Sequence, residues 1–163
     1  TTPFPTGNIN MVKEPTKGYF CDYDQWATLV SQAYAAPKPM LLSVEANGHA
    51  NSRDIWMAVD MSNLDTKAVG ATLQVWLTED QIVGKQKMPD NSTKDDYVHN
   101  HLLRASISSL WGETCSIHAG EEYLQTYQYT LPEKVVADNC NVVSVLSVGG
   151  VVVQVKETKI TIK

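Results

Sequence analysis

Apolar and polar residues alternate with a period of two along most of the chain after residue 39. The alternation is clearest at 54–61 and at 72–78, and it predicts half-buried β-strands in both places. Further strands are expected at 40–47, 98–107, 122–131, 141–148 and 151–162. Because many short strands follow one another with no second helix, the pattern predicts a mainly β fold, an antiparallel immunoglobulin-like β-sandwich.

The first 38 residues have a different pattern, which predicts one helix ahead of the sandwich. Asp22 and Gln25 have the spacing of a capping pair, and the helix is expected to end before Pro37. The apolar stripe expected on this helix consists of Trp26, Leu29, Val30, Ala33 and Tyr34. We therefore divide the chain into an N-terminal segment, 1–38, and a β-sandwich domain, 39–163.

Three details refine the expected sandwich. Gly149 and Gly150 suit the positive φ angles of a tight turn between the last two strands. The final strand changes its apolar face before Ile160, so it should either bulge near 156–158 or pass from one sheet to the other. The polar stretch 85–96 is expected to be a loop.

Composition limits the kinds of partner. The chain has 163 residues, of which 43% are apolar and 19% charged, and this is typical of one folded domain. Its 13 basic and 18 acidic residues give a net charge of -5 with no basic cluster, which argues against a nucleic-acid partner. No apolar run is long enough to cross a bilayer. Because the chain begins at Thr1 rather than Met, we expect it to be part of a longer precursor.

The three cysteines are not spaced as metal ligands. Cys115 and Cys140 have the option of pairing across neighbouring strands in an oxidising compartment, which would leave Cys21 over. The alternative, which we favour, is that all three remain free thiols inside the fold.

Histidine and arginine gather on the predicted strand 98–107. His99 and His101 are two residues apart, so they would share a face and be able to chelate a metal with Asp95 or Asp96. We favour hydrogen-bonded histidines instead, and expect no metal and no other cofactor. Arg104 would lie on the opposite face and either pair with a carboxylate such as Glu79 or Asp80 or donate to loop carbonyls.

Two tryptophans lie on the polar faces of their predicted strands. If the strands were neighbours, Trp56 and Trp76 would form an exposed aromatic patch of the kind that binds sugars or proteins. The favoured alternative is that the N-terminal helix covers both rings with its apolar stripe.

No catalytic signature is present. The chain has no Gly-x-Ser-x-Gly, no phosphate-binding glycine loop, no His-Glu-x-x-His and no Cys-x-x-Cys. We therefore expect a protein that is not an enzyme and has no catalytic residues.

An ordered set of residues gives the chain a family resemblance. The set is Val75-Trp76-Leu77-Thr78-Glu79-Asp80, then Gln86, then Tyr97-Val98-His99-Asn100-His101, then Leu103-Arg104. With these residues the region from about 41 to 163 resembles the twenty-eight-kilodalton outer-membrane lipoprotein family of Gram-negative anaerobes. The resemblance implies a signal peptide in the precursor, a lipid anchor on a preceding segment, and residence at the outer membrane.

The same resemblance interprets the N-terminal segment. Family members resemble a thioredoxin-like domain followed by a β-sandwich. Phe4-Pro5-Thr6-Gly7-Asn8 is similar to the proline loop of a thioredoxin fold, and the helix after Asp22 would be that fold's final helix. The half that would carry a redox Cys-x-x-Cys is not in this sequence, so thiol–disulfide chemistry is not assigned to it.

We expect a non-catalytic domain that acts in binding or adhesion at the cell surface, through a protein or glycan partner. The candidate contact residues are Trp56, Trp76, Tyr97, His99, His101 and Arg104. One alternative is an accessory domain of a thioredoxin-like redox lipoprotein, and another is a metal-binding envelope protein.

Overall fold

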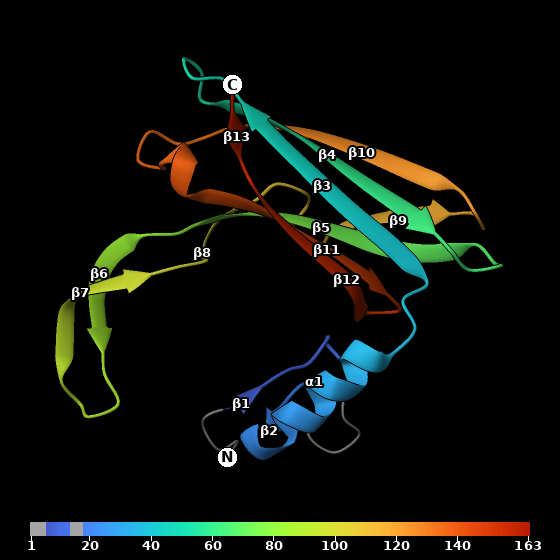
Figure 1. Ribbon diagram of the computed structural model, residues 1–163, viewed down its shortest axis with the longest axis horizontal. Helices are drawn as coiled ribbons and strands as arrows, with labels where there is room; N and C mark the ends of the chain where they lie inside the picture. Colours follow the sequence, from blue (N-terminus) through green and yellow to red (C-terminus); the bar gives the residue numbers. More distant parts are fainter. Residues whose placement is uncertain (1–5, 14–17) are drawn as a thin grey trace.

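Two sheets packed face to face form the body of the computed structural model, which describes residues 6–13 and 18–163 (Figure 1). The four-stranded sheet has the order β10 (Glu122–Thr130), β4 (Asp54–Asn63), β3 (Met40–Gly48) and β13 (Thr161–Ile162). The other sheet has the order β12 (Val151–Lys159), β11 (Cys140–Val148), β5 (Val69–Glu79) and β8 (Leu102–Ser106), and β9 (Glu113–Ile117) also pairs with β5. The sandwich is mainly β and antiparallel as expected, and its arrangement is consistent with an immunoglobulin-like fold.

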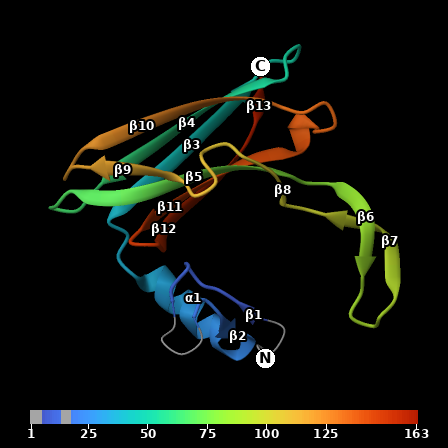
Figure 2. The ribbon, with the colours of Figure 1, turned by 180° about the vertical axis from the view of Figure 1, so that it is seen from behind.

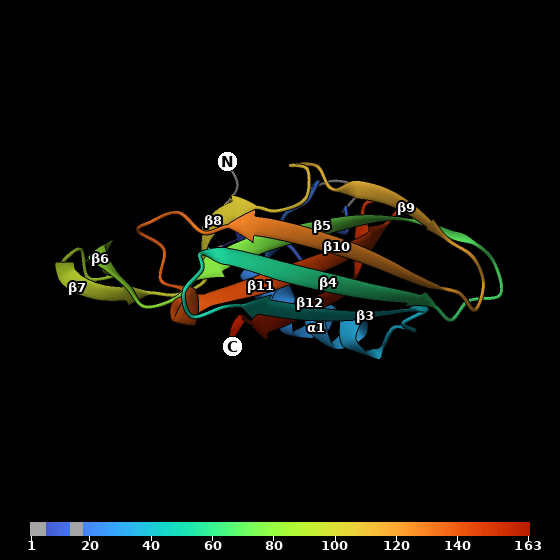
Figure 3. The same ribbon diagram turned by 90° about the horizontal axis from the view of Figure 1, so that it is seen from above.

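The core lies between the two layers, which Figure 3 shows from above with β10, β4 and β3 over β5 and β11. Alternate residues of β4 and β5 point into it, and each is at most 2% exposed: Ile55, Met57, Val59, Met61, Ala71, Leu73, Val75 and Leu77. A strand places successive side chains on opposite faces, so the apolar alternation in the sequence becomes a one-sided apolar sheet. Burying these two faces against each other is the main stabilising contribution.

The last strand changes sheets. After β12 the chain passes through buried Ile160, and β13 then pairs in parallel with β3, with Ile162 opposite Gly48. This confirms the second of the two expected solutions. A register shift does occur in the β11–β12 ladder, between Leu146 and Ser147, but not near 156–158. The tight turn before β12 is also confirmed, with φ of 57° at Gly149 and 83° at Gly150.

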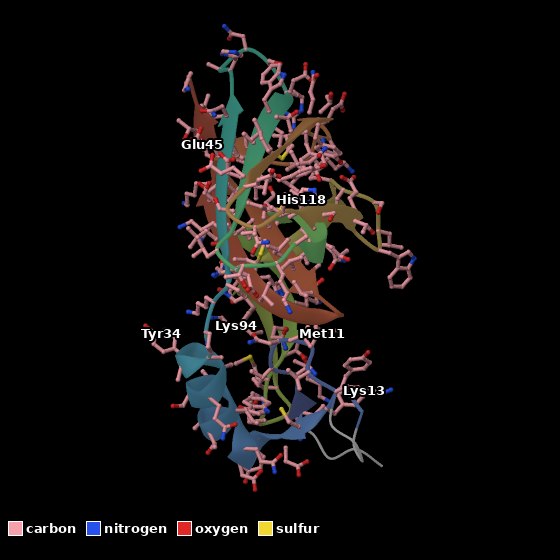
Figure 4. All side chains as sticks on the ribbon, turned by 90° about the vertical axis from the view of Figure 1, so that its right-hand side faces the viewer. Met11, Lys13, Tyr34, Glu45, Lys94 and His118 are labelled. Atoms are coloured by element: carbon pink, nitrogen blue, oxygen red, sulfur yellow. The ribbon has the colours of Figure 1, made fainter. Side chains whose placement is uncertain are left out.

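The N-terminal segment forms its own small unit beside the sandwich. It contains a two-stranded ladder of β1 (Thr6–Gly7) and β2 (Cys21–Asp22), the 3-10 turn η1 (Tyr23–Gln25) and helix α1 (Trp26–Ala35). The predicted helix is confirmed, although it begins through the 3-10 turn and Gln25 makes no side-chain capping bond. None of the residues of α1 is buried, and Tyr34 points outward from it (Figure 4). The expected proline loop lies partly outside the described residues.

A hairpin replaces the loop that was expected at 85–96. It consists of β6 (Ile82–Lys87) and β7 (Thr93–His99), and we call it the arm. Figures 1 and 2 show the arm projecting from one end of the sandwich. Nearly all of β7 is exposed, so both faces of the hairpin meet solvent. The sequence pattern missed it because apolar alternation appears only when one face of a strand is buried.

The disulfide considered between Cys115 and Cys140 is absent, and the three cysteines are free and buried. Cys115 lies opposite Ala71 and Cys140 lies opposite Glu79, so they face positions eight residues apart on β5. At roughly 3.3 Å per residue that separation is about 26 Å, far beyond the reach of a disulfide.

A second 3-10 turn, η2 (Ala137–Asn139), leads into β11. Within the described part of the chain, no helix has the length and apolar character needed to cross a membrane.

Candidate functional site

A buried ion pair lies at the end of β5, next to the point where the arm begins. The side chain of Glu79 is 1% exposed, its Oε1 accepts from the backbone N–H of Val136 at 2.8 Å, and its Oε2 lies 2.9 Å from Nε of Arg104. The β5–β8 register moves from Leu77 opposite Ala105 to Thr78 opposite Leu103, so Arg104 is the extra residue of a β-bulge. A bulge re-aims a side chain, which brings Arg104 to the carboxylate as the sequence predicted.

A second carboxylate holds the turn that follows the arm. Asp80 accepts from the backbone N–H of His101 at 2.7 Å and from the amide Nδ2 of Asn141 at 2.8 Å. The ring of His101 lies between two acids, with Nδ1 3.5 Å from Asp80 and Nε2 3.4 Å from Glu157. The His101 N–H and, second, the Asn141 amide hold the pKa of Asp80 below its ordinary value because both donate to the ionised form.

The lowered pKa of Asp80 predicts a pH-dependent contribution to stability. A carboxyl group with a depressed folded-state pKa stabilises the fold above its unfolded pKa of about 3.9, and this contribution is lost as the pH falls through the folded value. Asp80→Asn should therefore be less stable than wild type at neutral pH, and the gap should narrow below about pH 4. Urea unfolding at several pH values measures it. Asp60→Asn, an exposed acid on β4, controls for the loss of one negative charge.

The structure separates the two histidines that were expected to share a strand face. β7 ends at His99 and β8 begins at Leu102, while His101 has a φ of 56° in the turn between them. The expectation of one strand over 98–107 is therefore wrong at this point, since the chain reverses there. The described residues contain no group of three His, Cys, Asp or Glu side chains that could hold a metal ion.

Aromatic side chains lie on one face of the arm and aliphatic side chains on the other. The rings of Tyr97 and His99 lie 4.9 Å apart at 60°, next to Gly84, whose missing side chain leaves space beside them. On the other face Val83 pairs directly with Val98, and these two are 65% and 41% exposed. The arm therefore presents apolar surface that nothing in the described chain covers.

The two tryptophans lie on different sheets, so they do not form the joint patch that was considered as one alternative. Trp56 points outward from the four-stranded sheet, is 40% exposed, and meets His49 edge-on at 5.5 Å. Trp76 points outward from the other sheet, where it pairs with Val143 and Ser106 and is half-buried. The sequence predicted their faces correctly, but it had no information on which sheet each strand joins.

The expectation that the helix covers both rings is wrong, because Trp56 is 40% exposed on the four-stranded sheet while the stripe of the helix faces β12. The stripe residues Leu29, Val30 and Ala33 line a cleft of about 820 Å³, and residues 151–155 of β12 form the other wall. The apolar stripe thus faces the edge strand of the five-stranded sheet across open space.

Sequence reasoning missed the most exposed apolar pair of the sandwich. Leu110 and Trp111, in the connection between β8 and β9, are 68% and 85% exposed. The available signal was an uncharged run, 105–112, that ends in Leu-Trp-Gly. A connection that is apolar at its tip is unusual because exposed loops are generally polar.

The chain is similar to known proteins in sequence and in fold. Residues 1–163 match the sequence model of the family described as outer membrane protein Omp28. A domain of the outer membrane lipoprotein Omp28 from Porphyromonas gingivalis is similar with a TM-score of 0.53 and 21% identity, over 78% of this chain and 93% of that one. HBP35 of Porphyromonas gingivalis is similar with a TM-score of 0.73 and 11% identity, over 98% of this chain and 54% of that one. The chain therefore spans about half the length of HBP35.

The sporulation control protein Spo0M from Bacillus subtilis is also similar, with a TM-score of 0.52 and 13% identity over 77% of this chain and 49% of that one. No curated protein matches the sequence. At these identities the structural likenesses show a shared fold, and a shared fold alone carries no activity.

Proposed function

The chain belongs to the Omp28 family of outer membrane proteins, and from this premise we propose that it is a non-catalytic domain that binds a protein partner at the cell envelope through its arm. The observation that carries the proposal is the exposed hairpin of 82–99, which has apolar side chains on both faces. Its base adjoins the buried Glu79–Arg104 ion pair, and we call this base the root of the arm. The lipid anchor that the resemblance implies for the precursor is part of the same proposal.

The root would keep the arm in one position. A hairpin of two strands is barely stable alone in water, so its conformation depends on how its ends are held. Here the ends adjoin Glu79, Asp80 and His101, which are tied to Arg104 and Asn141 by ion pairs and hydrogen bonds. We therefore assign His101 and Arg104 a positioning role, and Tyr97 and His99 a contact role.

The chemistry of the arm favours a protein over a glycan. Apart from their mutual ladder, β6 and β7 join no other described strand, so their outer edges offer backbone N–H and C=O groups for an added strand. Val83, Val98 and Tyr97 supply apolar and aromatic contacts, which are enriched where proteins bind each other. A glycan stacked on the Tyr97–His99 pair is the competing occupant.

The two thiols within the sandwich argue against thiol chemistry at Cys115 and Cys140. Burial raises the pKa of the Cys140 thiol to about 11 and also raises the pKa of Cys115. Because the thiolate is the reactive form, both groups are poor nucleophiles at neutral pH.

Replacing Tyr97 with alanine should weaken binding of the chain to outer-membrane fragments of Porphyromonas gingivalis by about 30-fold or more, as expected for an interfacial hot spot. Surface plasmon resonance on immobilised fragments measures this. Tyr123→Ala, on β10 of the four-stranded sheet, is the matched control because its 37% exposure is close to the 36% of Tyr97, and it should bind like wild type. Equal binding by wild type and Tyr97→Ala would contradict the proposal. Binding that survives protease treatment of the fragments but is lost after periodate oxidation would indicate a glycan instead.

A second candidate function, an accessory domain of a redox lipoprotein, is favoured by the cleft between α1 and β12. Both of its walls are mostly apolar, as a surface would be that packs against further polypeptide, although Gln32 and Lys38 on one side and Gln154 on the other also line it. The residues encoded ahead of Thr1 discriminate this candidate, since it requires a Cys-x-x-Cys in that region.

A further inference from the structure

The connection between β8 and β9 carries an apolar knob on the sandwich. Leu110 and Trp111 are more exposed than any other large apolar residue of the described sandwich, 39–163. Figure 3 shows this connection at the edge of the layer that contains β8 and β9. The knob belongs to a different part of the fold from the arm, because its turn is bonded to Gln74 and Val75 in the middle of β5, whereas the arm begins beyond the end of β5 at Ile82.

Hydrogen bonds fix the backbone of the knob. The backbone N–H of Val75 donates to the hydroxyl of Ser108 at 3.0 Å, and the amide of Gln74 donates to the carbonyl of Leu110 at 3.3 Å. The N–H of Gly112 donates to the carbonyl of Ser109 at 2.9 Å, and the Ser109 hydroxyl donates back to the carbonyl of Gly112. A surface that is already ordered loses little conformational entropy when it binds.

The polar groups around the knob are already used within the protein. The hydroxyls of Ser108 and Ser109 and the amide of Gln74 take part in the bonds that build the turn. The run 105–112 has no charged residue, and the carboxylate that follows it, Glu113, accepts from the Tyr127 hydroxyl at 2.8 Å. A sugar needs polar groups that fix its orientation, so this surface suits an apolar partner better.

We propose that the knob inserts Leu110 and Trp111 into the interfacial region of a phospholipid bilayer. Indole rings favour the membrane–water interface, where the ring is buried and its N–H stays hydrated. A protein interface normally buries about 800 Å² on each partner, whereas one aromatic residue buries about 150–250 Å². A bilayer requires no such minimum area, and the family resides at the outer membrane. Because the turn is uncharged, insertion should depend little on salt or on anionic lipid.

Flotation of the full chain with phosphatidylcholine vesicles tests the proposal. Wild type should float with the vesicles, and Leu110→Ser/Trp111→Ser should lower the partition coefficient at least about tenfold, which corresponds to about 1.4 kcal/mol. Leu124→Ser replaces an apolar residue of comparable exposure on β10 and should float like wild type. Unchanged thermal melting of the double variant would show that its fold is intact.

Phosphatidylcholine brominated near the headgroup reports the position of the ring itself. Wild-type fluorescence should be quenched as vesicles are added, whereas Trp111→Phe should still float but lose most of the quenching. The proposal is overturned if wild type does not float, if the double serine variant floats equally well, or if added salt abolishes binding. Loss of self-association in the double variant, with no vesicle binding by wild type, would assign the knob to a protein contact and likewise overturn it.

Discussion

Replacing Arg104 with alanine should lower the free energy of unfolding by about 3–5 kcal/mol. The reason is the position of Glu79, whose side chain is 1% exposed and whose Oε2 lies 2.9 Å from Nε of Arg104. Removing the guanidinium leaves a charged carboxylate in the interior without its counter-ion. Urea denaturation followed by circular dichroism measures the change.

Two matched variants separate this effect from a general loss of charge. Adding Glu79→Gln to Arg104→Ala removes the stranded charge and should recover part of the lost stability, since an amide oxygen can still accept from Val136. Lys85→Ala breaks the 3.2 Å ion pair between Lys85 and Asp95, in which the two side chains are 78% and 74% exposed. Because this pair is exposed, its loss should leave stability close to that of wild type. If Arg104→Ala cost no more than Lys85→Ala, the buried pair would not be what holds the root of the arm.

Gly112→Ala should destabilise the fold by about 2–4 kcal/mol, from backbone strain and overpacking together. Gly112 has a φ of 86°, a region that L-residues adopt at a cost. A Cβ there would lie 2.5 Å from Cγ2 of Thr72 and 2.9 Å from the carbonyl oxygen of Leu73. Because backbone atoms of β5 cannot move aside easily, the turn that presents Trp111 must shift, and vesicle flotation should fall along with the melting temperature.

Gly120→Ala is the matched control for that variant. Gly120 also has a positive φ, 71°, but a Cβ there would meet no atom within 4 Å. It should cost only the backbone strain, about 1 kcal/mol. A similar cost for the two glycines would show that the close approach of Gly112 to β5 does not matter. Differential scanning calorimetry on both variants gives the comparison.

The local pattern predicted the parts of this fold that depend on neighbours in sequence. Period-two alternation identified β4 and β5 and the faces they bury, because a strand that lies on a core must be apolar on one side. The reversal of apolar face before Ile160 correctly suggested a strand that leaves its sheet, and β13 does so. The arm escaped prediction because it has no buried face, so its pattern resembles that of a polar loop.

The candidate site depended on contacts between residues distant in sequence. The pairing of Arg104 with Glu79 was predictable from opposite charges at the ends of two strands, but the bulge that produces it was not. The prediction that His99 and His101 share a strand face was wrong because a turn, with positive φ at His101, interrupts the run that looked like one strand. Trp56 and Trp76 do not form the aromatic patch that was considered, because their strands belong to different sheets.

Patterning along the chain, then, was enough to establish a β-sandwich with one leading helix, which of its faces are apolar, and a resemblance to an outer-membrane family. These follow from local periodicity and residue order. The assembled fold was needed to show that an arm projects from a buried ion pair, that α1 faces β12 across a cleft, and that Trp111 is exposed on a hydrogen-bonded turn. Sheet membership, register and burial arise from long-range packing, and a window of neighbouring residues contains no information about which distant strand lies beside it.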